Sequence, residues 1–222
     1  MGEYLAQQGF SVLGVRLAGH ATCPQDMIRM RYTDWMVSVE DGFYLLSGTS
    51  QRIFLIGLSM GGILSLLMST HLPVAGVIAM ATPYRLPLDY PLWFIQLASL
   101  FLRFQPKTKE APDAGWYDKE AFSQHVSYPQ NPMRSGVELK KLVTNMQAAL
   151  PQVSVPVLLV HSRDDTTVPP DDMSRIYAQL GTSDKAMLWV EGGGHVITEE
   201  PTRQRVFEAA SGFIHRVTGV TR

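Results

Sequence analysis

Ser59 has the sequence surroundings of a nucleophile. It lies in Gly57-x-Ser59-x-Gly61, between an apolar run at 53–56 and apolar residues that return at helical spacing from Ile63. The run has no alternation, which predicts a strand buried on both faces. Strand, Gly-x-Ser-x-Gly and helix together predict a sharp turn that holds the serine in strained backbone. Amides at the start of the helix would then face an anion formed at Ser59.

A serine hydroxyl needs a base to take its proton and a third group to orient that base. His195 follows three glycines and a predicted strand, which suits a loop that delivers an imidazole to a fixed point, and it is the favoured base. His161, at the end of a predicted strand, is expected to be a hydrogen-bonded structural residue. His20 could lie near the site but precedes the serine. The remaining histidines lie near predicted helix ends or in the middle of the chain: His71, His125 and His215.

Two adjacent aspartates compete to orient the base. Asp164 and Asp165 follow the predicted strand at 155–161. Asp165 is favoured, Asp164 is left as the alternative, and Glu191 is a weaker third candidate. Serine, acid and histidine each follow the carboxyl end of a predicted parallel strand, where open α/β sheets place their sites.

The predicted elements alternate along most of the chain. Helices are expected at 1–8, from Thr33 to about Leu46, and at 63–72, 136–150, 171–180 and 201–217; strands are expected at 10–17, 53–56, 74–81, 155–161 and 185–190. This rhythm predicts one α/β domain with a mostly parallel sheet. Its core would be 1–82 and 136–222, with a cap or lid insertion at 83–135 that shows no strand pattern. The apolar helical stretch at 91–102 belongs to the lid, or alternatively is a core helix that buries itself.

Composition and motifs exclude several classes. A formal net charge of −1 gives no reason to expect a nucleic acid or an acidic membrane surface as partner. The histidines and the single Cys23 lack metal-ligand spacing, and there is no dinucleotide or nucleotide-triphosphate motif, so neither metal nor cofactor is expected. The apolar window 91–104 is too short for stable membrane insertion. With no secretory signal and no disulfide framework, a cytoplasmic location is expected.

Four segments resemble the small α/β-hydrolase carboxylesterases and monoacylglycerol lipases of bacteria: 9–20, 57–62, 165–169 and 194–198. The most specific feature is Asp-x-x-Val-Pro from Asp165, followed about 30 residues later by Gly-His-Val-Ile-Thr around His195. The resemblance implies Ser59 as nucleophile, His195 as general base and then acid, and Asp165 as its orienter. It implies the Met60 backbone N–H as one oxyanion donor. The implied substrate is a short- to medium-chain carboxylic ester or monoacylglycerol.

The sequence departs from this family in two places. Ala21 and Cys23 stand where the family shows glycine and a hydroxyl residue. Family members also begin with further strands and a His-Gly loop that supplies the other oxyanion donor, before the helix at which Met1 falls. This difference predicts an unfilled strand position between 10–17 and 53–57. It also suggests the hypothesis that the sequence is part of a longer esterase.

Other functions remain open at this point. A thioesterase, a peptidase or a C–C bond hydrolase would use the same three residues. Haloalkane dehalogenases and epoxide hydrolases use an aspartate nucleophile, which Ser59 disfavours. The alternative from another class is a non-catalytic, hydrolase-like domain that binds an apolar ligand or partner through the 93–104 surface. The oligomeric state is not predicted.

Overall fold

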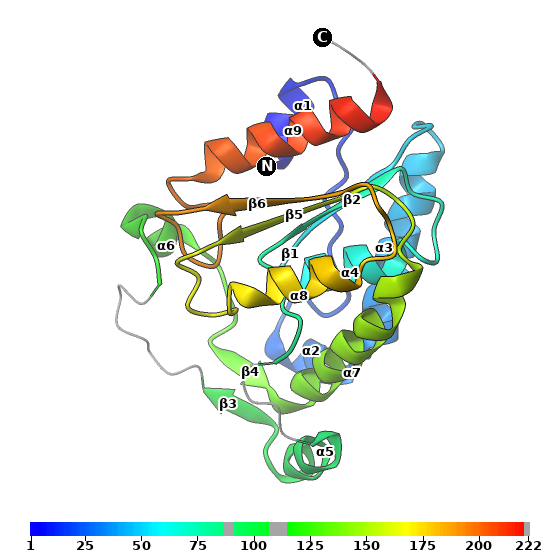
Figure 1. Ribbon diagram of the computed structural model, residues 1–222. Coiled ribbons are helices and arrows are strands. Elements are labelled where there is room, and N and C mark those ends of the chain that lie inside the picture. The colour runs from blue at the N-terminus through cyan, green and yellow to red at the C-terminus, as the bar shows by residue number, and fades with distance from the viewer. Residues whose placement is uncertain (87–90, 107–114, 220–222) are drawn as a thin grey trace.

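The computed structural model describes residues 1–86, 91–106 and 115–219. Its sheet has four parallel strands in the order β1-β2-β5-β6. These are β1 (Phe54–Leu58), β2 (Gly76–Met80), β5 (Val157–Ser162) and β6 (Lys185–Val190). The predicted α/β fold with a mostly parallel sheet is therefore confirmed, and all four carboxyl ends lie at one edge (Figure 1).

Helices cover both faces of this sheet (Figure 1). One face carries α1 (Gly2–Gln7) and α9 (Arg203–Thr218), and the other carries α3 (Tyr32–Ser47), α4 (Met60–Met68), α7 (Met133–Ala149) and α8 (Asp171–Gln179). A short 3-10 turn, η1 (Leu150–Gln152), follows α7. Helix α3 starts slightly before the predicted Thr33, because the Asp34 carboxylate accepts a hydrogen bond from the Arg31 amide at 2.7 Å and caps the helix there.

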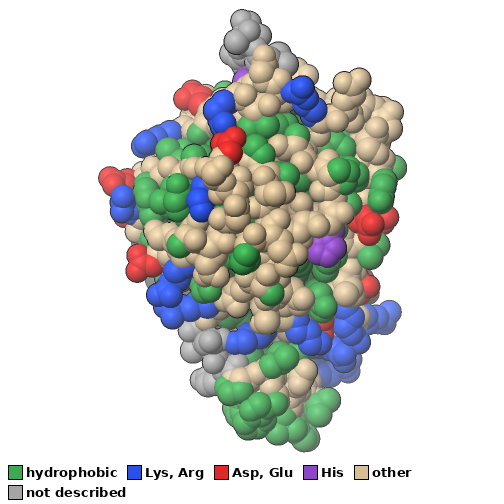
Figure 2. Space-filling view, turned by 45° about the vertical axis from the view of Figure 1, so that its right-hand side comes forward, with side chains coloured by type: hydrophobic (Ala, Val, Ile, Leu, Met, Phe, Trp, Pro, Cys, Tyr) green, Lys and Arg blue, Asp and Glu red, His purple; other side chains and the backbone are tan. Residues whose placement is uncertain are grey.

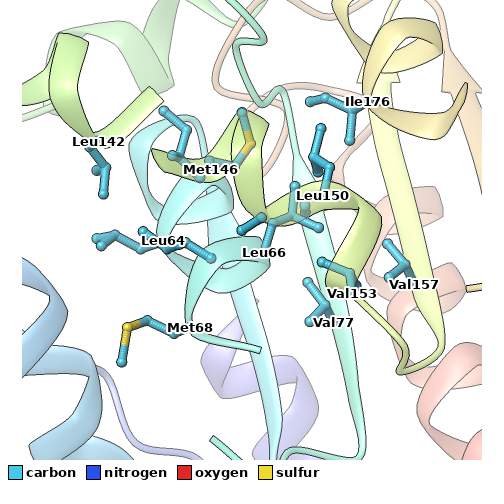
Figure 3. Close-up of a cluster of buried hydrophobic side chains, with 14 of the residues drawn as sticks. Leu64, Leu66, Met68, Val77, Leu142, Met146, Leu150, Val153, Val157 and Ile176 are labelled. Carbon is cyan, nitrogen blue, oxygen red and sulfur yellow. The ribbon is translucent and has the colours of Figure 1, made fainter. Parts of the chain in front are cut away.

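The central strands are buried on both faces, as their continuous apolar sequences predict. In β2, Val77 and Ala79 join the core beneath α4 and α7, whereas Ile78 and Met80 join the core beneath α9. The same alternation holds in β5. Figure 3 shows the larger core, where α4, α7 and α8 meet the sheet through side chains such as Leu66, Met146 and Ile176. Two cores on opposite faces fix the sheet, and hence the positions of the loops at its carboxyl edge.

The segment between β2 and α7 contains structure that the sequence analysis missed. Besides α5 (Leu92–Phe101) and α6 (Lys119–Gln124), it forms an antiparallel pair of β3 (Phe104–Pro106) and β4 (Gln130–Pro132). The expectation of no strands at 83–135 is therefore wrong; three-residue strands that end in proline are too short to show alternation. Residues 87–90 and 107–114 of this segment lie outside the described residues. A further helix, α2 (Pro24–Arg29), was also not predicted.

The predicted strand at 10–17 does not form. No backbone group of residues 11–16 bonds to another backbone group within the part of the chain that the structure describes. A cleft of about 630 Å³, lined by residues of this segment and of β1, separates the two. The physical reason for the error is that apolar residues such as Val12, Leu13 and Val15 indicate only a segment that can be extended. A strand also needs a neighbour within hydrogen-bonding distance.

The segment nevertheless keeps the side-chain pattern of a strand. Val12 lies beside Gly2 of α1, whereas Leu13 and Val15 lie beside Gly42 of α3. Successive side chains thus point to opposite faces, toward the helices that cover them. The cleft occupies the place of the unfilled strand position that the sequence predicts, and the hypothesis of a longer esterase stays a prediction.

We predict that the edge of β1 facing this cleft exchanges its amide hydrogens quickly. The Ser59 amide donates to Met80 O of β2, so alternation directs the Leu55 and Gly57 amides to β2 and the Ile56 amide to the cleft. Hydrogen exchange resolved by NMR should show Ile56 exchanging on the order of 100-fold faster than Leu55 and Gly57. Equal protection of all three amides would mean that the cleft is closed in solution.

Candidate active site

Ser59 sits at a strained turn between β1 and α4. Its backbone has φ 54° and ψ −118°, a conformation that residues with a side chain rarely adopt. The turn is held because the Ser59 amide donates to Met80 O at 2.8 Å and the Ser59 carbonyl accepts from the Gly62 amide at 2.9 Å. The structure thus gives Ser59 the sharp strand-to-helix turn that the sequence predicts. The Ser59 residue is half-buried there.

Two glycines make this turn possible by close packing. A Cβ on Gly57 would lie 2.1 Å from the backbone of Gly61, and a Cβ on Gly62 would lie 1.9 Å from Thr82 Oγ1. Both distances are far shorter than a contact between non-bonded atoms. A Cβ on Gly61 would meet nothing within 4 Å, so Gly62 rather than Gly61 is the second position where this packing requires glycine.

The Met60 amide is available to an anion. It is the first residue of α4, and its N–H makes no hydrogen bond within the described part of the chain. The amides of Gly62 and Ile63 instead bond to the Ser59 carbonyl. An unpaired N–H at a helix start next to a hydroxyl is a suitable donor to an oxyanion.

His195 is paired with Asp165. His195 Nδ1 lies 2.8 Å from Asp165 Oδ2, and the Asp165 side chain has no exposed surface. The neighbouring Asp164 faces another way, because its Oδ2 accepts from the Gly192 amide at 2.7 Å. Glu191 pairs with Arg163 at the surface. Of the three acids that the sequence offered, only Asp165 contacts the imidazole.

Four groups donate to the Asp165 carboxylate. Oδ1 accepts from the amides of Thr167 at 2.8 Å and Val168 at 2.9 Å, and Oδ2 contacts the rings of His195 and His161. Burial raises the pKa of the Asp165 carboxyl, but these hydrogen bonds and the charge interaction with His195 outweigh it, so the net pKa lies well below its usual range. The ionised carboxylate therefore stabilises the fold above about pH 4, and this contribution is lost as pH falls through the lowered pKa.

The loop that carries His195 is fixed at three consecutive glycines. The Gly192 amide donates to Asp164, the Gly193 carbonyl accepts from the Ser162 hydroxyl, and the Gly194 amide donates to Glu200 Oε1 at 3.0 Å. Gly194 also has no room for a side chain, since a Cβ there would lie 1.6 Å from the Gly115 carbonyl oxygen. These contacts set where the imidazole lies.

Glu200 is a site residue that the sequence analysis missed. Its carboxylate is fully buried and also accepts from the amides of Tyr117 at 3.1 Å and Asp118 at 3.0 Å. It therefore ties the His195 loop to the segment before α6, which lies beside the carboxyl ends of β5 and β6 (Figure 1). The Gly-His-Val-Ile-Thr segment gave no signal for this, because the partners are more than 80 residues away in sequence.

Among the other histidines in the described part of the chain, only His161 makes a hydrogen bond to this pair. His161 contacts the same Asp165 oxygen as His195, as described above. His20 bonds the Ala18 carbonyl and His125 bonds Glu199, while the remaining two, His71 and His215, lie near helix ends as predicted. No cluster of metal-binding side chains occurs within residues 1–86, 91–106 and 115–219. Among the described helices, none combines the length and apolar composition that crossing a membrane requires.

Ser59, Asp165 and His195 follow the carboxyl ends of β1, β5 and β6. The structure brings His195 and Asp165 into direct contact. Although both residues are described, no hydrogen bond joins the Ser59 hydroxyl to His195. Such bonds are often long in the absence of a substrate and shorten in its complex.

We predict that Glu200→Gln destabilises the protein. Both carboxylate oxygens of Glu200 now accept hydrogen bonds from backbone N–H groups. In the glutamine, an NH₂ group replaces one of these oxygens, so at least one backbone N–H would lose its acceptor. Chemical denaturation should show a loss of about 1–3 kcal/mol in the free energy of unfolding. The matched control is Glu199→Gln. The partly exposed Glu199 carboxylate pairs with His125 at 3.0 Å, and its substitution should change stability by less than about 1 kcal/mol. Equal effects of the two substitutions would contradict this role of Glu200.

Comparison with known proteins places this geometry in context. A carboxylesterase of Bacillus subtilis (strain 168) is 25% identical over 220 residues, which cover 98% of this chain and 86% of that protein. A thermostable monoacylglycerol lipase of Bacillus sp. (strain H-257) is 28% identical over 220 residues, covering 99% of this chain and 85% of the lipase. These relatives support ester hydrolysis as the activity of the group.

A solved structure of a lipolytic enzyme also resembles this chain. A structure from a study of two metagenome-derived lipolytic enzymes, LipS and LipT, matches with a TM-score of 0.82 and 26% identity, covering 97% of this chain and 86% of that one. The model of the family described as serine aminopeptidase, S33, matches residues 1–202. With that match over most of its length, the chain belongs to the serine aminopeptidase S33 family of α/β-hydrolases.

Proposed function

We propose that the protein is a serine carboxylic-ester hydrolase, with Ser59 as nucleophile, His195 as general base and acid, and Asp165 as orienter. The observation that supports this most directly is the 2.8 Å contact between His195 Nδ1 and the buried Asp165 carboxylate. The strained turn at Ser59 and the free Met60 amide beside it add to this. The names of the two Bacillus relatives favour esters among the substrates that such a site could cleave.

In the first half-reaction, Ser59 Oγ attacks the ester carbonyl carbon while its proton passes to His195 Nε2. Before the attack, the Nδ1–H of His195 donates to Asp165 Oδ2, which leaves Nε2 as the ring nitrogen that accepts the proton. The oxyanion of the tetrahedral intermediate accepts a hydrogen bond from the Met60 N–H. The carbon–oxygen bond to the alcohol then breaks, the alcohol takes the proton from Nε2, and the acyl group stays on Ser59.

In the second half-reaction, water attacks the acyl carbon and gives its proton to His195 Nε2. The intermediate releases Ser59, which takes the proton back, and the carboxylic acid leaves. Met60 is the oxyanion donor identified in this chain. Loss of one such donor typically costs about 2.7–4 kcal/mol in the transition state, so turnover by this chain would be slow if no second amide reaches the oxyanion.

The apolar helix α5 favours an ester with an acyl chain. None of its residues is buried, and Trp93, Leu100 and Phe101 are 64%, 74% and 84% exposed. Hydrophobic side chains gather at the end of the molecule where α5 lies (Figures 1 and 2). We propose that the segment 83–135 acts as the cap of the single domain and that its apolar surface contacts short- to medium-chain acyl groups.

The same exposed helix also supports a second candidate, a non-catalytic domain that binds an apolar ligand or partner. The missing hydrogen bond between Ser59 and His195 is consistent with it. The two candidates differ in one respect, because only a hydrolase forms a covalent adduct at Ser59. A fluorophosphonate probe that labels the wild type and not Ser59→Ala would exclude the non-catalytic function.

Hydrolysis of p-nitrophenyl esters with acyl chains of 2 to about 12 carbons tests the leading proposal. We expect Ser59→Ala to lower kcat at least about 10⁴-fold, because the acyl-enzyme can no longer form. A maximum between short and medium chains is expected from the cap. An aminoacyl p-nitroanilide assayed in parallel measures amide cleavage. Equal rates for wild type and Ser59→Ala on every ester would contradict the proposal, and a Ser59-dependent preference for the anilide would make the protein a peptidase.

A matched pair of substitutions tests the choice of acid. Asp165→Asn keeps the size of the side chain but can present an N–H to His195 and favour the wrong tautomer, so kcat should fall about 10³–10⁴-fold. Asp164→Asn keeps an oxygen for the Gly192 amide and should lower kcat less than about 10-fold. Steady-state kinetics of both variants, with folding checked by circular dichroism, distinguishes them. A larger loss of kcat for Asp164→Asn than for Asp165→Asn would mean that Asp164, and not Asp165, orients His195.

A further inference from the structure

His161 is a second imidazole on the Asp165 carboxylate. Its Nε2 lies 3.1 Å from Asp165 Oδ2, the same oxygen that lies 2.8 Å from His195 Nδ1. The His161 side chain is 1% exposed, whereas that of His195 is 18% exposed. The reaction steps proposed above use His195 alone, so they give no role to the buried His161 ring that contacts Asp165.

The surroundings of His161 identify which ring nitrogen carries its hydrogen. Nε2 faces two acceptors, Asp165 Oδ2 and, at 3.2 Å, the Val168 carbonyl oxygen. Nδ1 is buried and has no hydrogen-bond partner among the described residues. Because a nitrogen between two acceptors must be the donor, the hydrogen lies on Nε2. His161 therefore donates to Asp165.

The ring is held by rigid structure rather than by a loop. His161 is the fifth residue of β5 and pairs in register with Trp189 of β6. The two rings lie side by side, with centroids 6.4 Å apart. A buried side chain in the centre of a close-packed sheet has little freedom to rotate. His161 can thus hold in place a neighbouring side chain that has more rotational freedom.

Asp165 is a neighbour of this kind. It lies beyond the end of β5, and rotation about its Cβ–Cγ bond moves both carboxylate oxygens. The Thr167 and Val168 amides hold Oδ1, and His161 holds Oδ2. With three donors in place, one remaining direction at Oδ2 is open to the Nδ1–H of His195, which fixes the tilt of that ring.

We propose that His161 is a positioning residue that orients Asp165, and through it His195, for proton transfer with Ser59. This inference rests on the proposed function. The competing explanation is purely structural, with His161 serving only to satisfy the Val168 carbonyl and fill space between β5 and β6. The two explanations differ in their effect on turnover by folded protein.

Two amide side chains of different length provide the test. In His161→Gln the amide nitrogen reaches as far as Nε2, so it can still donate to Asp165, whereas in His161→Asn the amide is too short. Both variants place a similar polar group in the same buried position. His161→Leu, which has no donor at all, is a second variant of the short-reach kind.

We expect kcat of His161→Asn and His161→Leu to fall about 10- to 100-fold, as for a base displaced by a fraction of an ångström. KM should stay within about twofold, because substrate binding does not involve Asp165. His161→Gln should keep kcat within about threefold of the wild type. Rates are compared per folded protein, with the folded fraction measured by circular dichroism at the assay temperature.

Folded Asn and Leu variants with the kcat of the wild type would overturn the inference while the proposed function stands. Equal rates for wild type and Ser59→Ala would overturn the proposed function and this inference with it. NMR of ¹⁵N-histidine-labelled protein gives a readout that does not depend on turnover. We expect the hydrogen of His161 on Nε2, and a ring whose only hydrogen lies on Nδ1 would overturn the inference whatever the kinetics show.

Discussion

A carboxylate inside a protein stays ionised only if several donors surround it. The last third of this chain meets that requirement around Asp165, which two backbone amides and two imidazoles contact. The donors come from three kinds of structure: a turn supplies both amides, strand β5 supplies one imidazole and the glycine loop supplies the other. The burial of Asp165 and the placement of His195 are therefore one arrangement, because either residue would be unfavourable at its position without the other.

The same physical solution recurs away from the site. Three other buried carboxylates each accept the amide of a residue far away in sequence. Glu138 accepts from Tyr32, Asp172 from Tyr84, and Glu200 from Tyr117 and Asp118. A charged acceptor forms stronger hydrogen bonds than a neutral one. Glu138 of α7 thus joins the start of α3, Asp172 of α8 joins the segment after β2, and Glu200 joins the His195 loop to residues 117–118.

Sequence patterns predicted the elements whose signals are local. Strand β6 was predicted at 185–190 and has those bounds, and the turn at Ser59 followed from the residues immediately around it. The prediction at 10–17 failed because a strand depends on a partner, which the residues of one segment do not reveal. The short strands β3 and β4 carry too few residues for any periodicity.

The candidate site shows the same division. Spacing singled out Ser59 and His195 and favoured Asp165 over Asp164. The contact that turns Asp164 toward the Gly192 amide is one that no local pattern encodes. Glu200 went unnoticed because it looks like an ordinary acidic residue before a helix, and its burial depends on a segment more than 80 residues away. His161 was expected to be structural, and its contact with Asp165 appears only once the strand and the turn are built.

The contact between Gly194 and Gly115 has a thermodynamic consequence. Since the Gly115 carbonyl fills the space where a Gly194 side chain would lie, and Glu200 bonds to both segments, the His195 loop and residues 115–118 share one set of contacts. Any ligand that holds residues 115–118 in place also favours the observed position of His195. Linkage is reciprocal, so a ligand that holds His195 must favour the observed position of residues 115–118 by the same free energy. Ligand binding at residues 115–118 and the position of the His195 ring are therefore coupled.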